Sequence, residues 1–80
     1  MVKELDLSIR TITKVKDFVN CNWNFDGTVD VISGRYIIDG KSIMGVFSLD
    51  LTNSVHVKLT SNSESEIEKL LESYRNVKIL

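Results

Sequence analysis

The chain has 80 residues, which is room for one small domain, and we expect residues 1–80 to fold as a single unit. Apolar residues make up 42% and charged residues 26%, a globular composition that argues against disorder. The formal net charge is −1 with both signs scattered along the chain, so no basic stripe indicates nucleic-acid binding. No apolar stretch is long enough to span a bilayer, and no membrane partner is expected.

Cysteine and histidine usage bears on the compartment and on metal chemistry. Cys21 is the only cysteine, so the chain cannot form an internal disulfide or a zinc site built from cysteines. This usage fits a reduced, cytoplasmic compartment, with Cys21 as a small core residue. His56 is the only histidine, and no cysteine or carboxylate cluster adjoins it in the sequence. We therefore expect a cytoplasmic protein with no metal and no other cofactor.

The first half of the chain predicts three strands and a helix. Leu5, Leu7 and Ile9 alternate with polar residues, which is typical of a strand with one solvent-facing side. From residue 12 to 22–24 the apolar residues follow helical spacing, with the hydroxyl of Thr11 as the expected N-cap. Two strands are predicted around residues 28–31 and 36–38, on either side of a Ser33-Gly34 turn. The apolar face of the helix is formed by Ile12, Val15, Phe18 and Val19, with Trp23 alongside. Trp23 and Phe25 flank the end of the helix and are expected to cover the edge of the core.

The second half predicts a short helix, a strand and a longer helix. The short helix is expected over residues 42–51, capped by Ser42, and residues 55–59 alternate as clearly as any strand in the chain. Ser63 and Glu66 have the spacing of a capping box. The helix behind it carries an apolar stripe at i, i+3, i+4 and i+7, formed by Ile67, Leu70, Leu71 and Tyr74. The apolar tail at 77–80 either folds back or pairs with another chain.

The order of these elements, β-α-β-β-α-β-α, predicts an α+β fold. Four strands with the helices segregated to one face give a sandwich of two layers. A right-handed crossover through the first helix makes the first two strands parallel, with another strand able to lie between them.

Residues 41–49, Lys-Ser-Ile-Met-Gly-Val-Phe-Ser-Leu, resemble the segment around the regulatory serine of HPr, the histidine-containing phosphocarrier family of the bacterial sugar phosphotransferase system. The chain length and the order of elements are also similar to that family, so the resemblance covers essentially the whole chain. It implies an open-faced sandwich with a four-stranded antiparallel sheet and three helices on one face.

The resemblance fails at the site of catalysis. The family carries its phosphoryl group on a histidine that opens the first helix in an H-x-R-P motif. In this sequence Thr11 occupies the histidine position, Thr13 the arginine position and Lys14 the proline position. A threonine phosphate ester is too stable for rapid transfer, whereas phosphohistidine is a good donor. We therefore expect no catalytic residue and no enzymatic activity.

The resemblance also implies a regulatory role for the short helix. Ser42 matches the family's phosphorylated serine, although an ordinary N-cap hydroxyl explains it equally well. The adjoining apolar residues correspond to those that meet partner proteins in the family. The expected partner-binding residues are Lys41, Ile43, Met44 and Phe47, while Val46 and Leu49 are expected in the core.

These observations favour a non-catalytic regulatory or adaptor protein related to the phosphoenolpyruvate-dependent phosphotransferase system and to catabolite repression. The expected partners are an enzyme of that system, an HPr kinase-type enzyme or a transcriptional regulator. Two alternatives stay open, namely phosphotransfer through a non-standard acceptor and a binding domain unrelated to sugar uptake. His56 is expected to face solvent on its strand, away from the start of the first helix.

Overall fold

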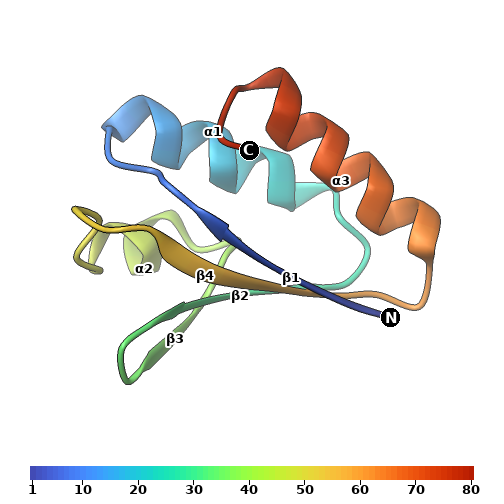
Figure 1. Cartoon of the computed structure of the whole chain (residues 1–80), viewed down its shortest axis with the longest axis horizontal. Coiled ribbons are helices and arrows are strands. Elements are labelled where there is room, and N and C mark those ends of the chain that lie inside the picture. Colours follow the sequence, from blue (N-terminus) through green and yellow to red (C-terminus); the bar gives the residue numbers. More distant parts are fainter.

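The computed structural model describes all 80 residues and contains one four-stranded sheet (Figure 1). Its strand order is β1-β4-β2-β3, and every neighbouring pair is antiparallel. Because β1 and β2 each pair with β4, they run parallel to each other with β4 between them, as the crossover argument predicts. The strands are β1 (Val2–Leu7), β2 (Thr28–Ser33), β3 (Tyr36–Asp39) and β4 (Val55–Thr60).

Three helices complete the predicted β-α-β-β-α-β-α order, namely α1 (Ile12–Trp23), α2 (Ile43–Phe47) and α3 (Glu64–Asn76). Figure 1 shows α1 and α3 lying side by side over one face of the sheet. The short α2 contacts α1 and the edge strand β3. This arrangement confirms the α+β sandwich. None of the three helices has the length and apolarity needed to cross a membrane.

The core lies between the sheet and the two long helices. On β4, Val55, Val57 and Leu59 are buried, while the residues between them face the other side of the sheet. The stripe predicted on α3 is confirmed, since all four of its apolar residues are buried. The ring centroids of Phe18 on α1 and Tyr74 on α3 lie 5.6 Å apart, so the helices meet through an aromatic contact.

The predicted bounds of the first strand are wrong. β1 begins at Val2 and ends at Leu7, which is the last residue paired with β4, opposite Val55. Ile9 is buried, as its place in the pattern predicts, but it lies in the connection to α1. Because Ile9 is buried although it lies beyond β1, the alternation of apolar and polar residues continues in the sequence past the end of the strand.

The predicted apolar face of α1 is right in the middle and wrong at both ends. Val15, Phe18 and Val19 are buried, whereas Ile12 and Trp23 are exposed. Ile12 lies in the first turn, next to the exposed cap. At the other end of the helix Trp23, which was expected to cover the edge of the core, is exposed, and the polar residue Asn22 is buried instead.

Asn22 links three parts of the fold through buried hydrogen bonds. Its Nδ2 donates to the carbonyl oxygen of Gly40 at 2.7 Å, in the loop after β3. Its Oδ1 accepts a hydrogen bond from the hydroxyl of Tyr74 on α3. Burial raises the pKa of Tyr74, so this hydroxyl stays protonated and remains a donor. A polar residue in the core is tolerated here because both ends of its amide are satisfied.

Ser63 is the N-cap of α3, but the predicted capping box does not form. The Ser63 hydroxyl is 2.8 Å from the hydroxyl of Ser65 and makes no cap bond to the backbone. The Ser63 N–H donates to Oγ of Ser61 at 3.1 Å. In a capping box the carboxylate of Glu66 would accept from the N–H of Ser63, which is bonded to Ser61 instead. The Ser-x-x-Glu motif therefore marks the start of the helix without forming the bonds of a capping box.

The C-terminal tail folds back on the domain, which decides between the two open alternatives. Ile79 is buried and its N–H donates to the carbonyl of Tyr74 at 3.0 Å. Nζ of Lys14 on α1 donates to the carbonyls of Val77 and Lys78, at 3.3 and 2.9 Å. Figure 1 shows the end of the chain beside α1.

Candidate functional site

Thr11 stands at the N-cap of α1, the position that the resemblance assigns to a carrier histidine. Its backbone is extended, with φ −110° and ψ 157°, and its Oγ1 accepts a hydrogen bond from the N–H of Lys14 at 3.1 Å. The predicted capping role is confirmed. The ammonium group of Lys14, in the first turn of the helix, is bonded to the C-terminal tail. This helix start therefore presents a capping hydroxyl and no imidazole.

Ser42 occupies the N-cap of α2, as predicted. Its exposed hydroxyl accepts a hydrogen bond from the N–H of Gly45 at 3.2 Å. A Cβ at Gly45 would lie 2.7 Å from Cγ2 of Ile38, so only glycine lets α2 approach β3 this closely. The serine hydroxyl is accessible on the outside of a helix that is fixed against the sheet.

Lys41 does not extend from the surface beside Ser42. Its Nζ donates to the carbonyls of Phe25 and Gly27, at 2.9 and 3.2 Å, and the residue is half-buried. The ammonium group thus bridges the start of α2 to the loop between α1 and β2. Two of the three donors of this ammonium group are therefore used within the chain.

The apolar residues of α2 divide between core and surface. Met44 is 77% exposed and Phe47 is 38% exposed, and their i, i+3 spacing puts them on one side of the helix. Val46 is fully buried, whereas Ile43 is half-buried against the core. The prediction that one of the adjacent residues Ile43 and Met44 faces solvent is confirmed. We call Ser42, Met44 and Phe47 the α2 surface.

α2 is shorter than predicted, ending at Phe47 instead of near residue 51. Beyond it Leu49 and Leu51 are half-buried and pack against the core individually. Oδ1 of Asp50 accepts from the N–H and the hydroxyl of Thr52, at 3.1 and 2.7 Å, and these bonds hold a turn that a longer helix would exclude.

His56 lies on the open face of the sheet, as predicted, but it is flanked by two carboxylates that the sequence order did not reveal. Its Nε2 is 2.8 Å from Oε1 of Glu4, and its Nδ1 is 2.9 Å from Oδ1 of Asp6. The register of β1 against β4 brings them together, since Asp6 pairs directly with His56. The carboxylate of Glu4 and, to a smaller extent, that of Asp6 accept hydrogen bonds from the charged ring, which raises the pKa of His56 above its ordinary value of 6.5.

This cluster predicts a pH-dependent contribution to stability. Because the folded-state pKa is raised, the contribution is fully present well below pH 6.5 and is lost as the pH rises through the folded-state value. In a His56→Gln variant we expect the pH dependence of the urea midpoint across this window to flatten. The measurement is a series of urea titrations of both proteins from acid to alkaline pH. A parallel pH dependence in the two proteins would show that the three side chains do not interact.

Cys21 is half-buried and packs against the core, in agreement with its predicted role. Burial, with a smaller effect of Asp17, raises the pKa of its thiol, so the group is held in its unreactive protonated form. Phe25 is buried as expected.

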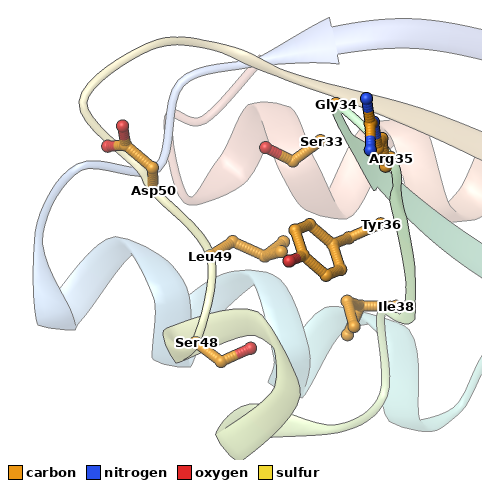
Figure 2. A pocket seen from close by; sticks show the side chains of 8 residues that line it. All are labelled: Ser33, Gly34, Arg35, Tyr36, Ile38, Ser48, Leu49 and Asp50. Carbon is orange, nitrogen blue, oxygen red and sulfur yellow. The ribbon is translucent and has the colours of Figure 1, made fainter.

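A hollow of about 460 Å³, beside the β2–β3 turn, was not predicted from the sequence (Figure 2). Figure 2 shows Tyr36 and Ile38 projecting from β3 toward Leu49, which lies in the segment after α2. The only signal for it in the sequence is an aromatic residue directly after a Ser-Gly turn. The hollow is lined by Ser33, Gly34, Arg35, Tyr36, Ile38, Ser48, Leu49 and Asp50.

Comparison with known proteins supports the fold. No protein-family profile matches the sequence, and no curated protein matches it. Among solved structures, the chain is similar to the crystal structure of HPr-C-His from Thermoanaerobacter tengcongensis, with 26% sequence identity and a TM-score of 0.65. The match covers 88% of each chain. The fold is therefore HPr-like, and it suggests a relation to the phosphotransferase system.

Proposed function

We propose that this chain is a bacterial, cytoplasmic HPr-like protein that regulates or adapts the sugar phosphotransferase system without carrying a phosphoryl group. It acts by docking to a protein partner through the α2 surface. The observation that carries the proposal is the 77% exposure of Met44, two residues after an accessible serine on a short helix of an HPr-like fold. Met44 and Phe47 lie one turn apart on α2 and are both exposed, and neighbouring exposed apolar side chains are typical of a binding surface.

The arrangement around the two candidate acceptors disfavours phosphotransfer. The hydroxyl of Thr11 serves as a helix cap, and its phosphate ester would be a poor donor. His56 has carboxylates at both ring nitrogens, which favours the imidazolium form. An imidazolium has no free lone pair with which to attack a phosphoryl group. His56 also faces away from the helices, because its neighbours Val55 and Val57 face them.

Incubation with the general phosphotransferase enzyme and labelled phosphoenolpyruvate tests the absence of carrier activity. We expect no acid-labile label on the wild-type chain. We expect little on a Thr11→His variant as well, since Thr13 supplies no cation and Lys14 is bonded to the tail. Acid-labile label on the wild type would contradict this part of the proposal, and rapid labelling of Thr11→His would show that the surrounding site is intact.

Phosphorylation of Ser42 would alter the α2 surface without entering the core. The phosphate would add nearly two negative charges next to the apolar side chains of Met44 and Phe47. A composite of charge and apolar area gives a partner both selectivity and contact area. The matching enzyme would be a protein kinase of the HPr kinase type, and the reader would be a transcriptional regulator or an enzyme of the system.

A pull-down from the source cells tests the docking surface. Met44→Asp should reduce partner binding by about tenfold or more, because it replaces an exposed apolar contact with a charge. Ser42→Ala should remove phosphate-dependent binding and lower stability by only about 0.5–2 kcal/mol through loss of the cap. The matched control is Val2→Asp, which changes an exposed apolar residue on β1. Identical partners for wild type, Ser42→Ala and Met44→Asp would exclude the α2 surface.

A further inference from the structure

β3 forms a free edge of the sheet, and its outward backbone groups can be identified. The N–H of Gly40 donates to the carbonyl of Val29 at 2.7 Å, and Val31 pairs with Ile38 in the same register. Since alternate residues of an antiparallel strand face the neighbouring strand, the N–H and C=O of Ile37 point away from the sheet. No backbone bond outside the ladder uses either group.

The side chains of β3 do not protect this edge. Edge strands are usually guarded by proline, lysine or inward-pointing charges, and β3 has none of these between its two ends. Tyr36 is 68% exposed and Ile37 is 67% exposed, on opposite faces of the strand. By contrast the other edge strand, β1, carries Lys3, Glu4 and Asp6.

Charges of opposite sign flank the strand. Arg35 precedes β3 and makes no ion pair within the chain. Asp39 ends β3, where its Oδ1 accepts from the N–H of Lys41 at 2.9 Å and its second oxygen stays available. Arg35 and Asp39 are equally far from Ile37 in sequence, so the strand is complementary to an antiparallel copy of itself.

We propose that β3 pairs antiparallel with β3 of a second copy of this chain, about a two-fold axis at Ile37. Ile37 then faces Ile37 of the second copy in the kind of pair that exchanges two backbone hydrogen bonds, which matches the outward direction of its groups. Arg35 of each copy faces Asp39 of the other. A self-complementary strand is what a closed two-fold interface requires.

The hollow beside β3 has room for the pair of side chains formed by Tyr36 of one copy and Ile38 of the other. In this register Tyr36 of the second copy lies opposite Ile38, on the face of the sheet where Tyr36, Ile38 and Leu49 line the hollow (Figure 2). An aromatic ring against a β-branched residue is a favourable cross-strand pair. Each copy thus contributes a tyrosine ring to the other's hollow, and the volume of about 460 Å³ is sufficient for it.

Sedimentation velocity from micromolar to millimolar concentration tests the interface through its charges. The wild type should shift from monomer to dimer. Arg35→Asp and Asp39→Arg should each weaken association by about tenfold, because each creates two like-charge pairs across the axis. The double variant carrying both changes restores opposite charges and should dimerise again. Lys3→Asp, on the opposite edge of the sheet, is the matched control and should behave as the wild type.

A second variant separates the interface from effects on folding. Ile37→Pro removes an N–H that makes no bond within the chain, so circular dichroism should show an intact fold while the dimer is lost. A wild type that stays monomeric throughout, an Ile37→Pro protein that dimerises normally, or a double charge variant that does not recover would each overturn the proposal. Dissociation by Lys3→Asp instead would assign the interface to β1.

Discussion

Replacing Asn22 with leucine should lower the free energy of unfolding by about 2–6 kcal/mol, since two buried polar groups lose their partners at about 1–3 kcal/mol each. The carbonyl of Gly40 and the hydroxyl of Tyr74 are both bonded to the Asn22 amide in the core. Leucine has the same branching and is more apolar, so the gain from apolar burial opposes this loss and places the net effect toward the lower end of the range. Urea denaturation of the variant and the wild type measures the difference.

Tyr74→Phe is the control for this prediction. It removes only the hydroxyl and leaves the bond from Asn22 to Gly40 in place, so we expect the smaller loss of about 1–3 kcal/mol. In the double variant the tyrosine hydroxyl is no longer present to be left unpaired. The losses of unfolding free energy in the two single variants should therefore add up to more than the loss in the double variant. Simple additivity would mean that Asn22 and Tyr74 are not coupled.

Leu70→Ala should lower the free energy of unfolding by about 2–5 kcal/mol, because it leaves a cavity in the hydrophobic core. Leu70 is buried in the confirmed stripe of α3. Domains of this kind are stable by only about 5–15 kcal/mol, so the variant should be partly unfolded under mild denaturation. The shift of the urea midpoint, with the slope held common, measures the effect.

Ile12→Ala provides the matched control, because Ile12 is also a large apolar residue of a helix but is exposed. Its effect should lie within about 0.5 kcal/mol. If the two variants were equally stable, the stripe of α3 would not be part of the core.

The elements that were predicted correctly are those whose apolar residues follow a single periodicity, either that of a strand or that of a helix. Val55, Val57 and Leu59 alternate because a single strand separates core from solvent, and the stripe on α3 follows one helical face. Errors arise where a tertiary contact overrides the local pattern. Ile9 is buried beyond its strand, and Asn22 is buried because Gly40 and Tyr74 satisfy it. Gly40 and Tyr74 are far from Asn22 in the sequence, so the pattern around residue 22 does not show that they bind its side chain.

The candidate site shows the same division. The caps at Thr11 and Ser42 and the exposure of Met44 follow from neighbouring residues, and all three were predicted. The commitment of the Lys41 ammonium to carbonyls of another loop was not predicted. The carboxylates around His56 were missed because they lie on β1, about fifty residues earlier, and only the strand register brings them to it.

The strand order also determines when this protein can fold during its synthesis. β4 is the last strand to leave the ribosome, yet it is the partner of both β1 and β2. Until residues 55–60 emerge, the hairpin of β2 and β3 can form but β1 has no strand to pair with. The apolar residues of β1 and α1 therefore stay uncovered on the nascent chain, and long-range pairing of this kind is slow. A chain that stops before β4 lacks the partner of both β1 and β2, so the four-stranded sheet cannot form on it.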